Sequence, residues 1–342
     1  MKAAVVSAPG KLEVWDVPDP RPGEYEALCR LEFGATCTGT DTHIIDGVFP
    51  FSAPLPTILG HESVGRVLEL GPKAGALRVG DLVTRVGSPA FPERGISVTW
   101  GGFAEYGIAR DHWSMRRDGL PASSWSGARV NRILHPAVRP QDAPMFTTWR
   151  ETLSYVRRVG VTAGATVLII GSGGNGLSFA CHARELGAGL VVMVGSAALE
   201  ERARRAGVTH YLDYRSTELA EELRTVCPSG VEFLIDAVGK RASADVGLPL
   251  LCRGGTVGVY GVDDYGSIGL GLSRARSSFR VYAGGYDESE THQEVTDLYL
   301  SGRLDASIWY QQEDAVPLEQ IGKAFDAVRR RVSPKALVRL SG

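Results

Sequence analysis

The chain has 342 residues, which is more than a single hydrophobic core normally supports, so its length predicts two domains. Its hydrophobic share of 44%, charged share of 22% and formal net charge of −2 are ordinary for a globular protein and point to no charged partner. No basic run is interleaved with aromatic residues and no apolar run exceeds strand length, so we expect neither a nucleic-acid partner nor a membrane partner.

The N-terminal segment and the cysteines predict a cytoplasmic protein. Residues 1–8 are stopped by Pro9 and Gly10 before a signal-peptide core could form. The five cysteines are widely spaced and include no C-x-x-C pair, which favours reduced thiols over a disulfide framework. Cys29 on a strand, Cys181 in a helix and Cys252 at the end of a helix are each interpreted as small buried hydrophobes.

A polar turn after the strand of Cys29 carries a possible metal ligand. Residues 35–43 contain Cys37, Thr40, Asp41 and His43, and Gly60-His61-Glu62 follows about two dozen residues later. Thiolate, imidazole and carboxylate groups are the ligands that zinc prefers in proteins. The two segments together predict a metal site.

A glycine-rich turn predicts a dinucleotide site. An apolar run at residues 165–170 predicts a strand, a helical pattern covers residues 177–186, and between them stands Gly171-Ser172-Gly173-Gly174-Asn175-Gly176. In this strand-turn-helix context Gly171 permits the tight turn, Gly173 lets the backbone approach a pyrophosphate, and Gly176 lets the helix pack close to the strand. The phosphates would then bind at the helix N-terminus. The alternative is a glycine-rich surface turn without a ligand.

The following elements continue the same α/β pattern. Val/Leu/Ile-rich segments predict buried parallel strands at residues 190–194, 211–213, 231–238 and 255–262, with helices at 198–206 and 241–251. We therefore predict an α/β fold with a doubly wound parallel sheet, the Rossmann type, over residues 146–284. Further along, helices at 289–300 and 317–330 and a strand at 335–340 return the chain to the first domain.

The end of the second strand of this domain predicts NADP rather than NAD. NAD-binding chains usually place a carboxylate there for the ribose 2′-hydroxyl, whereas this chain has Gly195 and Ser196. Tyr214 and Arg215 end the next strand and can supply a stacking face and a positive charge for a 2′-phosphate. The alternative is that Gly195 merely ends a strand, Tyr214 is packed and Arg215 is a solvated charge.

The motifs together resemble a known family. Cys37, Gly60-His61-Glu62, the segment Trp100-Gly101-Gly102-Phe103-Ala104-Glu105-Tyr106 and the glycine turn are similar to those of the zinc-dependent medium-chain alcohol and polyol dehydrogenases. The resemblance implies a mainly β, GroES-like catalytic domain at residues 1–145 and 285–342, beside the Rossmann domain at 146–284. It also implies a homodimer or homotetramer that pairs subunits through the strand near residues 278–282.

The resemblance also implies roles for individual residues. Cys37 and His61 would hold a catalytic zinc, Glu62 would orient the site or ligate the metal, and Thr40 and His43 would relay a proton to solvent. Besides the glycine turn, the expected cofactor contacts are Thr148, Gly195, Ser196, Tyr214, Arg215, Ala237 and Val238.

Three departures from the family pattern stand out. Where relatives place a third zinc ligand, this chain has Ala143 or Pro144, which have no donor atom, so only Asp142, Glu151 or Glu62 could complete the coordination, after a local shift. Residues 38–40 separate the cysteine from Asp41, where the family usually has two residues. Residues 87–135 contain no cysteine, so we expect no structural zinc.

Three functions remain open on this sequence. The leading hypothesis is an NADP-preferring oxidoreductase that interconverts a secondary alcohol, polyol or sugar hydroxyl with its carbonyl at a zinc site. The second is a zinc-free NADPH-dependent quinone, enoyl or carbonyl reductase of the same superfamily, and the third is a non-catalytic NADPH-binding protein. Phe49, Phe51, Trp100 and Phe103 are candidates for apolar walls of a substrate pocket or for core residues.

Overall fold

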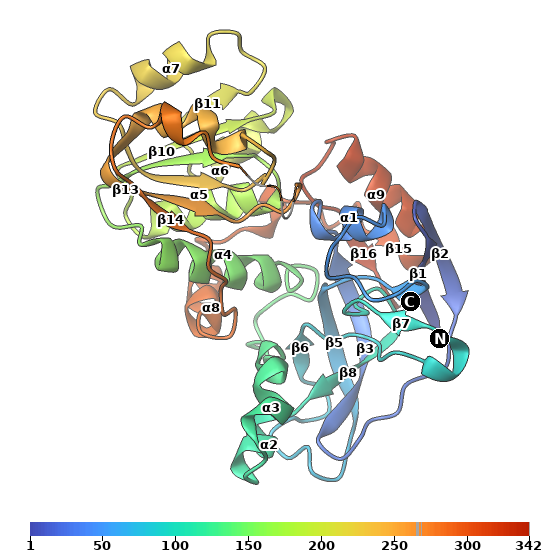
Figure 1. Cartoon of the computed structure of the whole chain (residues 1–342). Helices are drawn as coiled ribbons and strands as arrows, with labels where there is room; N and C mark the ends of the chain where they lie inside the picture. Colours follow the sequence, from blue (N-terminus) through green and yellow to red (C-terminus); the bar gives the residue numbers. More distant parts are fainter. Residues whose placement is uncertain (265–266, 268, 342) are drawn as a thin grey trace. The chain divides into compact units, whose positions relative to one another are not determined.

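The computed structural model describes residues 1–264, 267 and 269–341, which form two compact units (Figure 1). Unit 1 comprises Met1–Arg150, Glu288–Arg330 and the C-terminal residues from Lys335 onward. Unit 2 comprises Glu151–Asp287 and the short return segment Arg331–Pro334.

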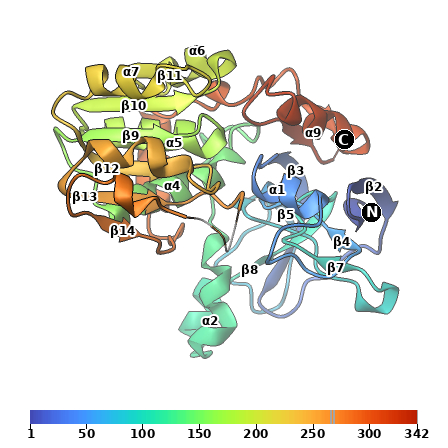
Figure 2. The same ribbon diagram turned by 45° about the horizontal axis from the view of Figure 1, so that its top comes forward.

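Unit 2 is built on one parallel sheet of six strands, which confirms the predicted doubly wound α/β fold. The strands are β9 (Thr166–Ile170), β10 (Leu190–Gly195), β11 (His210–Asp213), β12 (Val231–Asp236), β13 (Leu251–Val259) and β14 (Arg280–Tyr282). Their order in the sheet is β11-β10-β9-β12-β13-β14, so the direction of winding reverses between β9 and β12 (Figure 2). Ligands of such sheets bind beyond the carboxyl ends of the strands at this reversal.

Helices and buried aliphatic side chains stabilise this sheet. The helices after β9, β10 and β11 are α5 (Gly174–Glu185), α6 (Glu200–Arg205) and α7 (Leu219–Val226). Leu168, Val192, Leu234 and Val257 contribute one fully buried side chain from each of four neighbouring strands. Because parallel strands are covered on both faces, they carry the continuous apolar runs that made them visible in the sequence.

The helix predicted at residues 241–251 is wrong. Two short 3₁₀ turns, Ser243–Val246 and Leu248–Leu250, occupy this stretch, and β13 begins directly after them. Ala242 has a left-handed backbone with φ of 64°, and Pro249 has no N–H to donate within a helix. Cys252 therefore lies near the start of a strand and is partly exposed, whereas we expected it to be buried at the end of a helix.

Unit 1 is mainly β and contains two sheets. Its strands are β1 (Lys2–Ala8), β2 (Lys11–Asp16), β3 (Glu26–Ala35), β4 (Thr57–Ile58), β5 (Glu62–Leu70), β6 (Leu82–Thr84), β7 (Ser97–Val98), β8 (Tyr106–Arg110), β15 (Val316–Pro317) and β16 (Leu337–Arg339). One sheet has the order β2-β1-β4-β7 and the other β15-β16-β3-β5-β6, with β8 paired to β3. The predicted mainly β partner domain is confirmed, and the final strand from the sequence joins its larger sheet.

The remaining helices are α1 (Thr40–Ile45), α2 (His112–Arg117), α3 (Ala122–Trp125), α4 (Met145–Val159), α8 (His292–Leu300) and α9 (Ile321–Arg329). The last two are shorter than predicted, and a 3₁₀ turn, Leu318–Gln320, precedes α9. Among the described residues, no helix is both long and apolar enough to cross a membrane.

Candidate functional site

Three neighbouring strands of unit 1 bring the predicted metal ligands together. In the antiparallel ladders Ala35, at the end of β3, is paired with Glu62, the first residue of β5, and with Leu337, the first residue of β16. Cys37 follows the end of β3 by two residues, and His61 immediately precedes β5. Both therefore lie at the same end of the sheet.

Cys37, His61 and Glu62 form a compact, buried cluster of metal-binding groups. One potential ligand atom from each lies within 4.8 Å of the others, and the three residues are 6%, 6% and 1% exposed. The ligands of a tetrahedral zinc lie about 3.3–3.8 Å apart, given metal–ligand distances of about 2.0–2.3 Å. A thiolate, an imidazole and a carboxylate at this spacing fit a zinc ion that keeps one position for a small molecule.

Asp41 orients the imidazole of this cluster. Its carboxylate accepts a hydrogen bond from the backbone N–H of Cys37 at 2.8 Å, and its other oxygen lies 3.2 Å from Nδ1 of His61. Nε2 is then the ring nitrogen on the side of Glu62, whose Oε1 lies 3.7 Å away. Burial lowers the pKa of His61, but the charge of Asp41 and its hydrogen bond, together with Cys37, outweigh burial and hold the pKa well above its usual value. A carboxylate behind a ligating histidine is a common second-layer arrangement in metal sites.

Glu62 is held from the other side by a buried lysine. Nζ of Lys335 lies 2.6 Å from both carboxylate oxygens of Glu62, and the hydroxyl of Thr148 donates to Oε1 at 2.9 Å. Lys335 is 1% exposed, and its place beside Glu62 could not be predicted because 273 positions separate the two residues. In the sequence, Lys335 is recognisable only as a single lysine just before the apolar C-terminal strand.

The other two candidates for a third ligand are engaged elsewhere. Asp142 accepts hydrogen bonds from Arg139, Tyr299 and Gln312 inside unit 1. Glu151 belongs to unit 2, where its Oε2 accepts from the hydroxyl of Tyr260 at 3.1 Å. Of the three carboxylates considered from the sequence, Glu62 is the one found in the cluster.

The two residues expected to relay a proton share a short helix. Thr40 is the first residue of α1 and His43 lies in its last turn, so the two side chains are three positions apart on one helical face. Asp41, from the same helix, contacts His61 directly. Both Thr40 and His43 are partly exposed, as groups connecting a buried site with solvent must be.

A small cavity of about 150 Å³ adjoins the cluster. It is lined by His61, Ser63, Arg85, Trp100, Gly127 and Val130. The rings of Trp100 and His61 are 5.1 Å apart, and Phe49 packs against both Trp100 and Phe51. Phe103, by contrast, is fully buried against Phe325 and belongs to the core.

Arg85 is a wall residue of this cavity that the sequence analysis missed. Its Nη1 donates to the backbone carbonyl of His61 at 2.9 Å, and its guanidinium forms an ion pair with Glu288 at 2.8 Å. The fully buried Arg150 binds the other oxygen of Glu288 at 2.7 Å. Arg85 also has a left-handed backbone, with φ of 58°, a conformation that residues with a Cβ keep only where their surroundings hold it.

The glycine turn of unit 2 has the geometry of a pyrophosphate cradle. Gly171 has φ of 108°, and a Cβ on Gly176 would lie 1.9 Å from the carbonyl oxygen of Gly171, so helix α5 packs directly on the turn. A Cβ on Gly173, by contrast, would meet no atom within 4 Å. The turn is thus closed on the protein side and open at the N-terminus of α5, where an anion would bind. The side chain of Val238, after β12, borders the same turn.

The ends of β10 and β11 leave no room for an acidic side chain at residue 195. A Cβ on Gly195 would lie 2.3 Å from the hydroxyl oxygen of Ser172 and 2.4 Å from that of Tyr211. These hydroxyls are fixed, because Oγ of Ser172 accepts from the N–H of Ser196 at 3.1 Å and the hydroxyl of Tyr211 donates to the carbonyl of Ser196 at 2.6 Å.

Two arginines surround Tyr214 just beyond β11. Nε of Arg215 and Nη1 of Arg331 each donate to the hydroxyl of Tyr214 at 3.0 Å, and both guanidinium groups lie over its ring. The hydrogen bond from Arg331, followed by that from Arg215, lowers the pKa of Tyr214. Arg331 is not among the cofactor contacts expected from the sequence. Asp213 is nearby, with its Oδ1 bound to the backbone N–H of Arg215.

Two family models match separate parts of the chain. Residues 23–119 match the family model of the alcohol dehydrogenase GroES-like domain, and residues 174–298 match the model of zinc-binding dehydrogenases. A crystal structure of a zinc-binding dehydrogenase from Sinorhizobium meliloti, bound to NADP, has the same fold, with a TM-score of 0.78 and 24% identity over 99% of this chain and 98% of that one.

Two curated relatives extend the comparison. A protein named probable zinc-binding alcohol dehydrogenase from Mycobacterium tuberculosis is 28% identical over 97% of this chain and 86% of its own length. The acryloyl-coenzyme A reductase of Sulfurisphaera tokodaii is 31% identical over 75% of each chain. The chain therefore belongs to the zinc-type alcohol dehydrogenases of the medium-chain dehydrogenase/reductase superfamily, which are nicotinamide-dependent oxidoreductases.

Proposed function

We propose that the protein is an NADP-preferring dehydrogenase that interconverts a secondary alcohol, a polyol or a sugar hydroxyl with its carbonyl at a zinc site. The observation that carries this proposal is the cluster of Cys37, His61 and Glu62, whose ligand atoms lie within 4.8 Å of one another beside a small cavity. A cytoplasmic location and an arrangement in two domains at residues 1–145 with 285–342 and 146–284 are part of the same proposal.

The residues of the site can be assigned separate tasks. A zinc ion held by Cys37, His61 and Glu62 would polarise the substrate oxygen and so favour hydride exchange with the nicotinamide. Asp41 keeps the imidazole of His61 in one orientation and tautomer by contacting Nδ1. Thr40 would take up the proton that leaves the substrate oxygen and pass it toward His43, which lies one turn further along α1.

The walls of the cavity would position the substrate. Trp100 lies against His61, so an apolar part of the substrate can pack on its indole ring. Arg85 and Ser63 add polar groups to the same cavity, which suits a substrate that carries further oxygen atoms.

The preference for NADP is supported by the ends of β10 and β11. Gly195 brings no negative charge that would repel a 2′-phosphate, and Arg215 and Arg331 lie together on Tyr214 just beyond the next strand. Planar guanidinium groups bind phosphate with charge-assisted hydrogen bonds. A catalytic efficiency tenfold higher with NADH than with NADPH would contradict this assignment.

Metal content tests the zinc site directly. We expect about one zinc per chain in protein purified without added metal, and loss of both zinc and activity in Cys37→Ala and His61→Ala. Cys29→Ala is the matched control, because Cys29 is also a buried thiol but lies on β3 outside the cluster. Wild-type protein that turns over a carbonyl substrate without zinc would refute the metal-dependent mechanism.

A zinc-free NADPH-dependent reductase is the second candidate. It is favoured by the hydrogen bonds of Glu62, because both of its carboxylate oxygens contact Lys335 and Oε1 also accepts from Thr148. It is also favoured by the relative that is an acryloyl-coenzyme A reductase. In that case quinones or enoyl thioesters would be reduced at equal rates with and without a chelator. A protein that binds NADPH tightly and turns over no alcohol, quinone, enoyl or carbonyl compound would instead be a non-catalytic binding protein.

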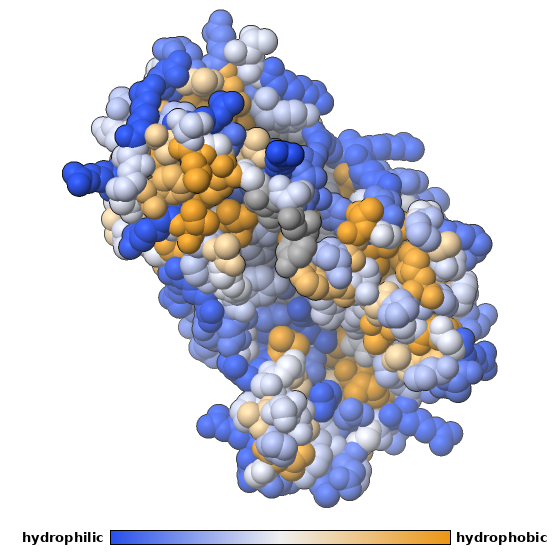
Figure 3. Space-filling model, in the orientation of Figure 1, coloured by the Kyte–Doolittle hydropathy of each residue, from blue (hydrophilic) through white to orange (hydrophobic). Residues whose placement is uncertain are grey.

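A homo-oligomer formed through the edge of the nucleotide sheet is also proposed. Strand β14 lies at one end of the sheet, and Val281 on it is 51% exposed. Figure 3 shows hydrophobic residues gathered over the part of unit 2 where Figure 1 draws β14, and Leu272 and Tyr286 are exposed large hydrophobics in this region of the chain. An uncovered edge strand is a template for pairing with a second copy. Val281→Lys should therefore give a monomer in light scattering, whereas the exposed Val79→Lys should not.

A further inference from the structure

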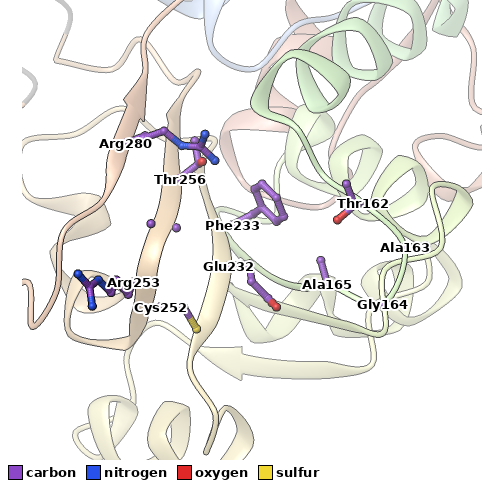
Figure 4. A pocket seen from close by; sticks show the side chains of 12 residues that line it. Thr162, Ala163, Gly164, Ala165, Glu232, Phe233, Cys252, Arg253, Thr256 and Arg280 are labelled. Atoms are coloured by element: carbon purple, nitrogen blue, oxygen red, sulfur yellow. The ribbon is translucent and has the colours of Figure 1, made fainter.

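Unit 2 contains a pocket at the amino ends of its strands, whereas the glycine turn lies at their carboxyl ends. The pocket has a volume of about 400 Å³ and is lined by the loop before β9 and by the first residues of β12, β13 and β14 (Figure 4). Its volume falls in the range of small-molecule sites. Phe233 of β12 lines this pocket, and Ala237, four residues further on, lies against Gly171 of the glycine turn. The pocket and the turn are therefore roughly 13 Å apart along the strand.

One side of this pocket is positively charged. Arg253 and Arg280 both line it, and neither has an ion-pair partner among the described residues. Figure 4 shows the guanidinium of Arg280 turned toward the side chain of Thr256, its register partner on β13. Unpaired guanidinium groups in a concave site attract anions, and their fork geometry matches a carboxylate.

Thr256 supplies the second observation. The residue is 4% exposed, and its hydroxyl is buried without a hydrogen-bond partner in the described part of the chain. A buried polar group without a partner is costly, so a hydroxyl of this kind in a pocket wall is available to a bound ligand or water. The hydroxyl can donate to an anion that lies on Arg280.

The other lining residues restrict the chemical class of the ligand further. The ring of Phe233, which is 8% exposed, separates Arg280 from the loop of Thr162 and offers an apolar surface (Figure 4). Glu232 adds one negative charge and accepts from the backbone N–H of Thr166 at 2.6 Å. With two arginines and one glutamate the lining carries a net charge of about +1, which suits a monoanion better than a dianion such as phosphate.

We propose that this pocket binds a small organic carboxylate, whose charged end contacts Arg280 and Thr256 and whose apolar body packs on Phe233. The site is separate from the proposed cofactor and metal sites and does not depend on the proposed reaction. Arg253 contributes attraction from the rim of the pocket rather than a direct contact.

The test is titration calorimetry with benzoate on the full-length protein, with and without saturating NADPH. Benzamide serves as the uncharged ligand of the same shape, and inorganic phosphate as the dianion. We expect one benzoate site per chain under both conditions, and binding at least about tenfold weaker for benzamide and phosphate.

Variants locate the site. Arg280→Gln should weaken benzoate binding about tenfold and Thr256→Val about threefold to fivefold, because each removes one donor to the carboxylate. Arg276→Gln removes an exposed arginine of the preceding segment that does not line the pocket, and it should bind as the wild type does. Because Thr256→Val preserves the side-chain shape, it tests the site even if Arg280→Gln disturbs strand β14. The proposal is overturned if benzoate does not saturate, if benzamide binds equally well, if phosphate binds more tightly, or if neither variant weakens binding.

Discussion

Replacing Lys335 by methionine should destabilise unit 1 strongly when no metal is bound. Lys335 and Glu62 are each 1% exposed, and Nζ lies 2.6 Å from both carboxylate oxygens. The substitution therefore leaves a buried negative charge that still accepts a hydrogen bond from Thr148. Breaking a buried ion pair by removing one partner costs about 3–5 kcal/mol. Methionine has nearly the same volume, so a cavity adds little to this loss.

Urea unfolding of chelator-treated protein, followed by tryptophan fluorescence, measures this change. The fluorescence reports unit 1 alone, because it contains all six tryptophans: Trp15, Trp100, Trp113, Trp125, Trp149 and Trp309. The double variant Glu62→Gln, Lys335→Met should recover most of the lost free energy, since both charges are then absent. Lys323→Met, at an exposed lysine of α9, is the control and should change the free energy of unfolding by less than about 0.5 kcal/mol. A loss below about 1 kcal/mol for Lys335→Met would show that the pair is not as desolvated as its burial indicates.

Three further predictions concern the cofactor and the pH. Gly173→Ala should weaken NADPH binding more than about tenfold in a fluorescence titration without lowering the melting temperature of the apoprotein. The reason is that a Cβ at residue 173 meets no protein atom within 4 Å but would face the bound pyrophosphate. Equal binding by the variant and the wild type would refute the pyrophosphate site. Arg331→Gln should weaken NADPH binding about tenfold and leave NADH binding unchanged, and an equal loss for both would remove the 2′-phosphate assignment. Burial, then Arg150 and Arg132, lower the pKa of His292 from 6.5 to about 3. The neutral histidine therefore costs no stability above pH 6.5, but the free energy of unfolding falls as the pH falls, by about 3 kcal/mol at pH 4. In urea unfolding of the apoprotein, the free energy of unfolding of His292→Gln should fall less steeply with pH than that of the wild type.

The parts of the fold that the sequence predicted well are those set by local pattern. Strands β9, β10 and β12 appear in the sequence as short runs of branched apolar residues. The glycine turn between β9 and α5 is equally recognisable, because its glycines are required by contacts within the same six residues. The segment at 241–251 was predicted as a helix because it lies between two predicted strands of the α/β pattern. The backbone of Ala242 and the missing N–H of Pro249 determine its actual form, and apolar spacing does not report either property.

The candidate site was predictable in its ligands but not in the residues that hold them. Cys37, His61 and Glu62 stand out because their residue types are suited to zinc and their segments are close in sequence. Lys335 and Arg331 were missed, since each acts on a residue more than a hundred positions away and a lone cation carries no motif. The contact of Lys335 follows from the order of the strands in the sheet, here from the pairing of β16 with β3. Strand order cannot be predicted from a short segment of sequence.

Gly195 has a consequence for how cofactor choice could change during evolution or in the laboratory. A single replacement by aspartate would not create an NAD site, because the first carbon of the new side chain would overlap the hydroxyls of Ser172 and Tyr211. Both hydroxyls also hold the backbone of Ser196, so trimming them loosens the loop that any acidic residue would have to occupy. A switch that places an acidic side chain at residue 195 therefore needs substitutions at Ser172 and Tyr211 as well. The packing of two hydroxyls against one glycine thus makes the end of β10 resistant to a change by one substitution.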